Sequence, residues 1–114
     1  MSKPIKILIV RFSSIGDIVL TSPVVRCLKN QIETEIHFLT KYKYHSLLVN
    51  NKYLDKIYYL ESSFSSTLKE LKKENYDYII DLHNNIRSFF LLRLGVKTIR
   101  YSKSNFNKIL NINF

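Results

Sequence analysis

The chain has 114 residues, of which 46% are hydrophobic, and this is the size and composition of one globular domain. No apolar run approaches the roughly 18 residues that span a membrane, and Met1 to Lys6 lacks the pattern of a secretory signal. The single cysteine, Cys27, provides neither a disulfide nor a zinc framework. We therefore expect a cytoplasmic protein, at most peripheral at a membrane.

The charge is strongly positive, with 18 Lys and Arg against 9 Asp and Glu and a formal net charge of +9. A field of this sign suits nucleic acid, anionic lipid or a phosphorylated substrate. The basic residues are spread along the chain, and neither a zinc-finger spacing nor an aromatic RNA-binding signature occurs. Nucleic acid is therefore the less favoured partner.

The chain opens with an apolar, β-branched run, Ile5 to Val10, which predicts a strand. A short polar turn follows, and a helical period then runs from about Asp17 to Gln31. Strand, turn and helix are the opening of a βαβ unit. Pro23 lies within the first two turns of this helix, so we expect a bend or an irregular turn near Thr21.

Strand and helix patterns alternate along the rest of the chain. Further strands are predicted at Glu35–Thr40, Lys56–Glu61, Tyr78–Leu82 and Lys97–Tyr101, and helices at Tyr42–Asn50, from Phe64 through Leu71, from Ile86 to Gly95 and within 102–114. This alternation predicts an α/β fold with an open, mainly parallel sheet and helices on both faces.

The first polar turn contains Ser13, Ser14, Gly16 and Asp17 and follows the first strand. In an open parallel sheet, ligands bind outside the carboxyl ends of the strands, where helix N–H groups attract anions. Gly16 suits a sharp turn or the close approach of a ligand. A carboxylate here is well placed to act as a base, but the spacing alone favours a role of Asp17 or Ser14 as only a helix N-cap, because Ser and Asp usually cap helices.

A second polar turn, with His83, Asn85 and Arg87, follows the strand Tyr78–Leu82 and is expected at the same edge. These side chains could contact a hydroxyl or a phosphate, or Arg87 could simply pair with Asp81 or lie in solvent. With only two glycines, no phosphate-binding loop can be assembled, and no carboxylate pair suggests a metal site.

Two blocks carry a resemblance to a known family. The run from Ile7 to Lys29 (ILIVRFSSIGDIVLTSPVVRCLK) resembles the N-terminal signature of the lipopolysaccharide heptosyltransferases of glycosyltransferase family 9. Asp77 to Ser88 (DYIIDLHNNIRS) is similar to a second block of that family. The resemblance extends from about Ile5 to about Tyr101.

The resemblance implies the N-terminal half of a GT-B type enzyme, a Rossmann-like, acceptor-side domain over residues 1–114, with the ADP-sugar domain absent. The implied reaction transfers a heptose or similar sugar from an ADP-sugar to a phosphorylated lipopolysaccharide core acceptor at the inner membrane face, inverting, without metal or cofactor. Asp17 would be the catalytic base, and Ser13, Ser14, Gly16, His83, Asn85 and Arg87 would contact the acceptor. We expect the 114 residues alone to be inactive. The alternative is a non-catalytic basic α/β module that binds a phosphorylated ligand or nucleic acid.

Overall fold

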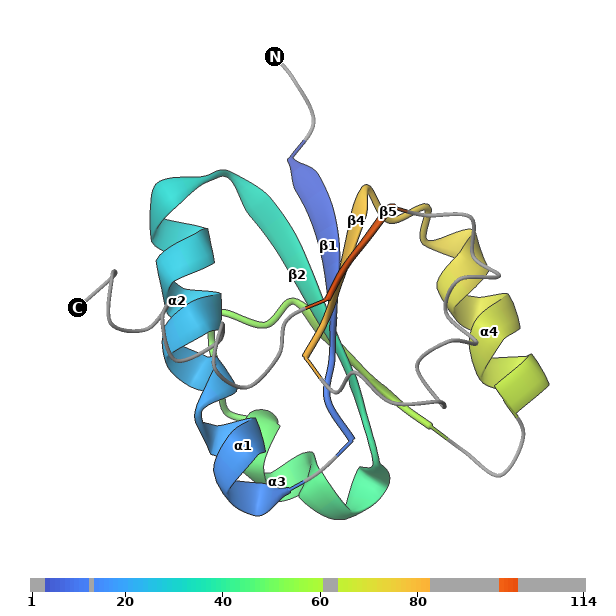
Figure 1. Cartoon of the computed structure of the whole chain (residues 1–114), viewed down its shortest axis with the longest axis horizontal. Helices are drawn as coiled ribbons and strands as arrows, with labels where there is room; N and C mark the ends of the chain where they lie inside the picture. Colours follow the sequence, from blue (N-terminus) through green and yellow to red (C-terminus); the bar gives the residue numbers. More distant parts are fainter. Residues whose placement is uncertain (1–3, 13, 61–63, 83–96, 101–114) are drawn as a thin grey trace.

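The computed structural model describes residues 4–12, 14–60, 64–82 and 97–100. Its elements, in chain order, are β1 (Ile5–Val10), α1 (Ile15–Val19), α2 (Thr21–Gln31), β2 (Thr34–Thr40), the 3-10 turn η1 (Tyr42–Tyr44), α3 (His45–Leu48), β3 (Lys56–Tyr59), α4 (Phe64–Lys73), β4 (Tyr78–Asp81) and β5 (Lys97–Arg100) (Figure 1). Within these ranges, no helix is both long enough and apolar enough to cross a bilayer.

The five strands form one sheet in the order β3-β2-β1-β4-β5. Every pair of neighbouring strands is parallel, and β1 pairs with β2 on one edge and with β4 on the other. The chain therefore builds the sheet outward from β1 in one direction, through β2 and β3, and then returns to add β4 and β5 on the other side. The expected α/β class with a parallel sheet is confirmed.

Helices cover both faces of the sheet (Figure 1): α1, α2 and α3 lie on one side and α4 on the other. Side chains of a strand alternate between the faces, so Ile7 and Ile9 pack toward α2 while Leu8 and Val10 pack toward α4. These four side chains are at most 4% exposed. Burial on both faces explains why β1 reads as a continuous apolar run.

The first helix differs from the prediction in its bounds. It begins at Ile15, two residues before the expected start, and it is interrupted at Leu20 before α2 continues to Gln31. The Thr21 hydroxyl donates to the Ile18 carbonyl at 2.6 Å, and Pro23 occupies the first turn of α2, where its missing N–H costs little. The irregularity expected near Thr21 is therefore confirmed. The helices expected at 86–95 and 102–114 lie outside the described residues.

Two aspartates fasten the amino ends of neighbouring strands. The Asp77 N–H donates to the Lys6 carbonyl, and the Asp77 carboxylate accepts from the Lys6 N–H, both at 2.8 Å. Asp55 makes the same pair of contacts with Ile36, again at 2.8 Å for each. Lys29 and the Ile36 N–H outweigh the effect of burial and hold the pKa of Asp55 below its usual value. These contacts fix β4 on β1 and β3 on β2.

A polar network centred on Glu74 lies on the α4 face of the sheet. The Glu74 carboxylate accepts from Lys6 at 2.8 Å, from Lys56 at 3.2 Å and from the Tyr58 hydroxyl. Burial favours the neutral form of this carboxyl, but the three hydrogen bonds are stronger and lower its pKa to about 2. Long-range charge pairs thus tie the end of α4 to β1 and β3.

We expect Glu74→Gln to lower the free energy of unfolding by about 2 kcal/mol at pH 7, because it removes hydrogen bonds to a charged acceptor. A carboxyl with a lowered pKa stabilises the folded state above its unfolded pKa, and this contribution is lost as the pH falls toward 2. The difference between the two proteins should therefore vanish between about pH 4.5 and pH 2 in urea titrations. Glu70→Gln, on the exposed side of α4, is the control. An unchanged difference at pH 2 would contradict the assignment.

Candidate active site

The carboxyl ends of β1 and β4 meet at one edge of the sheet. Val10 is paired with Asp81, and the Leu82 N–H donates to the Val10 carbonyl at 3.0 Å. The connection after β1 covers one face of the sheet, and the α4 connection that leads into β4 covers the other. This is a topological switch point, the place where open α/β sheets bind their ligands.

Arg11 joins the two strand ends at this point. Its guanidinium donates to the Asp17 carboxylate at 2.8 Å and to the Leu82 carbonyl. The side chains of Arg11 and Asp17 are 19% and 22% exposed, so the pair is shielded from most of the solvent. A charge-assisted bond in such surroundings orients the carboxylate firmly.

The start of α1 supplies the other contacts of Asp17. Ser14 is the N-cap of this helix and Asp17 is its third residue. The Ser14 hydroxyl donates to the Asp17 carboxylate at 3.0 Å, and the Ser14 N–H lies 3.5 Å from the same oxygen. Of the two residues that the sequence offered as the cap, the structure selects Ser14. Asp17 is oriented by Ser14 and Arg11 together.

Gly16 is the second residue of α1 and is exposed. It lies in a helix and does not make a sharp turn, so that part of the expectation was wrong. A Cβ added to Gly16 would meet nothing within 4 Å. The space beside this backbone is open, next to the Asp17 carboxylate.

The described residues include only part of the expected site. Ser14, Gly16 and Asp17 are brought together at the end of β1, and Asp81 is fully buried at the end of β4. Ser13, His83, Asn85 and Arg87 lie outside the described residues. Arg11 and the Leu82 carbonyl also belong to this arrangement and were not predicted from the sequence. The position of Arg11 directly after the first strand was a signal for it, because such residues lie at the functional edge.

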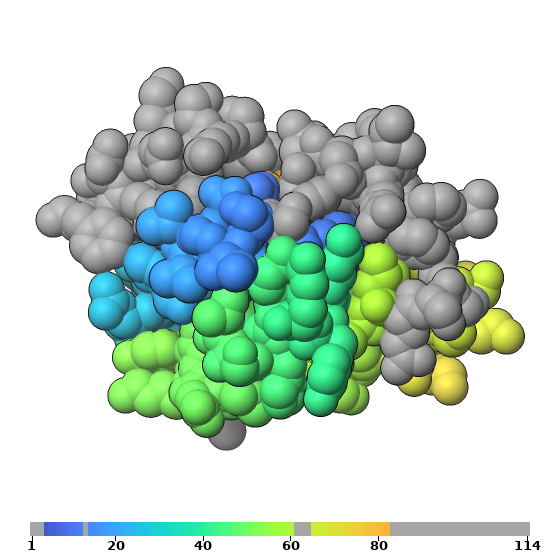
Figure 2. Space-filling view, turned by 90° about the horizontal axis from the view of Figure 1, so that it is seen from below, coloured from blue at the N-terminus to red at the C-terminus, as the bar shows by residue number. Residues whose placement is uncertain are grey.

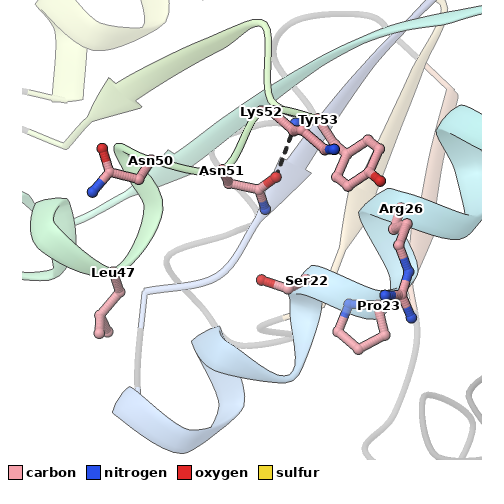
Figure 3. A pocket seen from close by; sticks show the side chains of 8 residues that line it. All are labelled: Ser22, Pro23, Arg26, Leu47, Asn50, Asn51, Lys52 and Tyr53. Atoms are coloured by element: carbon pink, nitrogen blue, oxygen red, sulfur yellow. Dashed lines mark hydrogen bonds between the residues drawn. The ribbon is translucent and has the colours of Figure 1, made fainter.

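A separate groove of about 480 Å³ lies on the α2 and α3 side of the molecule (Figure 3). Its lining comprises Ser22, Pro23, Arg26, Leu47, Asn50, Asn51, Lys52 and Tyr53. The Asn51 side-chain oxygen accepts from the Tyr53 N–H at 2.9 Å and shapes one wall. Asp17 does not line this groove. In the described part of the chain, no three His, Cys, Asp or Glu side chains are arranged to hold a metal ion.

The strand order defines a Rossmann-like α/β domain, and the polar groups at the switch point form a candidate ligand site at its carboxyl edge. No family model matches the chain. It is 29% identical to lipopolysaccharide heptosyltransferase 1 of Campylobacter coli over 96 residues, a match that covers 78% of this chain and 28% of the relative.

Solved structures with a similar fold come from the same class of enzyme as this relative. The E. coli ADP-heptose LPS heptosyltransferase II superposes with a TM-score of 0.75 at 19% identity, over 94% of this chain and 34% of that one. A family 9 glycosyltransferase from Veillonella parvula DSM 2008 gives 0.69 at 22% identity, over 88% and 32%. The chain thus resembles the glycosyltransferase family 9 heptosyltransferases, as the sequence predicted, and spans about a third of their length.

We expect Arg11 and Asp17 to be coupled in a double-mutant cycle. Arg11→Met and Asp17→Asn should each destabilise the chain, and their coupling energy in urea unfolding should be about 1 to 2 kcal/mol, because the pair is partly shielded. A control cycle combines Arg11→Met with Asp55→Asn, at the opposite edge of the sheet, and should be additive. Additivity of the Arg11 and Asp17 changes would show that the pair does not form.

Proposed function

We propose that this chain is the acceptor-side part of a glycosyltransferase that moves a heptose, or a similar sugar, from an ADP-sugar to a phosphorylated lipopolysaccharide core acceptor. The resemblance to heptosyltransferases supports the class of reaction and donor. The observation that carries the proposal is the Asp17 carboxylate, oriented by Arg11 and Ser14 at the switch point of the sheet.

In this mechanism, Asp17 accepts the proton of the acceptor hydroxyl while the hydroxyl oxygen attacks the anomeric carbon of the donor. The bond from that carbon to the diphosphate oxygen breaks, and ADP leaves with the electron pair. Attack from the face opposite to the leaving group inverts the configuration. A positioned carboxylate contributes about 10²- to 10⁴-fold to such a step. Arg11 positions the base, and no step requires a metal.

We propose that the residues of the two polar turns supply the remaining acceptor contacts, because loop residues beside a sheet crevice are often used in binding. These residues are Ser13, Ser14, Gly16, His83, Asn85 and Arg87. The ADP-sugar would be held by residues outside these 114, so the chain by itself is expected to transfer no sugar. We place the reaction on the cytoplasmic face of the inner membrane, where a lipid-linked acceptor would be reached.

Asp17→Asn should lower turnover at least about a hundredfold, because an amide keeps the shape of the side chain but cannot take the proton. The test requires both halves of the site, so it is made in a two-domain protein that joins this chain to a nucleotide-sugar domain. Transfer from ADP-heptose to a heptose-free lipopolysaccharide acceptor is measured.

Asp77→Asn is the matched control, since it changes a carboxylate at the opposite edge of the sheet and should leave transfer unchanged. Near-normal transfer by Asp17→Asn would remove Asp17 as the base. Together with tight binding of duplex DNA, that result would favour the non-catalytic binding module.

Gly16→Ala tests whether Gly16 is needed for the approach of a ligand or only for the fold. The new methyl group meets nothing within 4 Å, and alanine favours a helix over glycine, so the free energy of unfolding should rise by about 0.5 to 1 kcal/mol. If the acceptor approaches this backbone closely, its KM should increase several-fold despite the greater stability. An unchanged KM would show that the acceptor does not approach Gly16.

A further inference from the structure

Exposed apolar side chains gather on one end of the molecule. In the described residues, all the large exposed apolar side chains except Ile32 belong to residues 15–20 or 42–49. Ile15 and Val19 on α1 are 61% and 51% exposed, and Tyr42 of η1 and Leu47 of α3 are 66% and 40% exposed. Such a concentration marks an interaction surface.

The elements that carry these side chains lie next to one another. Figure 2 views the molecule from the carboxyl ends of the strands. In this view α1, in blue, lies beside η1 and α3, in green, and these elements are on the visible surface. Ile18 points inward into the same core cluster as Leu48. Ile15 and Val19, four residues apart, share the outer side of α1. Leu47 lines the groove that Ser22 and Pro23 of α2 complete.

The charges of this end are almost all positive. Segments 14–26 and 41–53 contain Arg26, Lys41, Lys43 and Lys52. Their only carboxylate is Asp17, which is paired with Arg11. Arg26, Lys43 and Lys52 are exposed. On α4, by contrast, the exposed lysines Lys69, Lys72 and Lys73 are accompanied by Glu70.

We propose that α1, η1 and α3 form a docking face for the surface of an anionic lipid bilayer. Exposed apolar side chains insert at the boundary between head groups and acyl chains, while neighbouring lysines attract the negative head groups. Neither duplex DNA nor free phosphate offers an apolar layer for Ile15, Val19 and Leu47. The choice of a bilayer rather than a protein partner rests on the proposed function, because Asp17 lies on the same short helix as Ile15 and Val19.

The test is co-sedimentation of the 114-residue chain with vesicles of phosphatidylglycerol and phosphatidylcholine, and with vesicles of phosphatidylcholine alone. These vesicles contain no lipopolysaccharide, so the result does not depend on sugar transfer. Anionic vesicles should bind the chain at least about tenfold more tightly, and this preference should weaken as the salt concentration rises toward about 0.5 M.

Ile15→Gln combined with Val19→Gln should weaken binding to anionic vesicles about tenfold, because it removes the inserted side chains. Lys43→Gln combined with Lys52→Gln should weaken it about five- to thirtyfold, since each lysine near an anionic surface contributes roughly a factor of five. The matched controls are Ile32→Gln, an exposed apolar residue outside the face, and Lys69→Gln combined with Lys72→Gln on α4. Both controls should bind as the unmodified chain does.

Equal binding to neutral and anionic vesicles, or equal losses in the test and control variants, would overturn the docking face. The proposal would also be wrong if Ile15→Gln combined with Val19→Gln left vesicle binding intact and abolished self-association of the chain. The face would then be a contact between protein molecules. Asp17→Asn removes a negative charge and leaves the inserted side chains in place, so it should bind anionic vesicles at least as tightly as the unmodified chain. Failure of the catalytic assignment and failure of the docking face are therefore distinguished.

Discussion

The structure depends on the complete enclosure of β1. This strand has hydrogen-bonded neighbours on both edges and packed side chains on both faces, and the side chains from Ile7 to Val10 are at most 4% exposed. β2 and β4 lie on opposite edges of β1. The connection that leads into β2 covers one face of the sheet and the connection that leads into β4 covers the other, so the two separate at the carboxyl end of β1. Arg11 is the next residue of the chain, and it therefore reaches both the Asp17 carboxylate and the Leu82 carbonyl. The geometry of the candidate site is a consequence of the strand order.

Features set by local sequence could be predicted. The apolar runs of β1 and β4 predicted strands because strands buried on both faces contain few polar interruptions. The predicted starts of β1, β2 and β4 agree with the structure to within one residue. Pro23 indicated an irregular helix start, and the break at Leu20 lies close to it. The two faces of helices followed from the alternation of strands and helices.

Features set by distant parts of the chain could not be predicted. Ser14 and Asp17 are both residues that cap helices, and the sequence does not show which one caps. The start of α1 at Ile15 makes Ser14 the N-cap, and Arg11 provides Asp17 with its ion pair. The contact of Arg11 with Leu82 spans 71 residues, and that of Lys6 with Glu74 spans 68. Polar positions inside a strand pattern, such as Lys6, are usually assigned to solvent. Here the strand order supplies Lys6 with a partner.

The aspartate contacts at the start of β3 and β4 place the alignment of the strands at one edge of the sheet and leave the candidate site at the other. Asp55 and Asp77 fix the two strands on their neighbours at the amino edge, whereas the carboxyl ends of β1 and β4, which lead into the polar turns, meet at the opposite edge. Changes in the length or composition of those turns would leave the strand register intact. The same scaffold could therefore acquire a preference for a different ligand through its turns alone, without a new arrangement of the sheet.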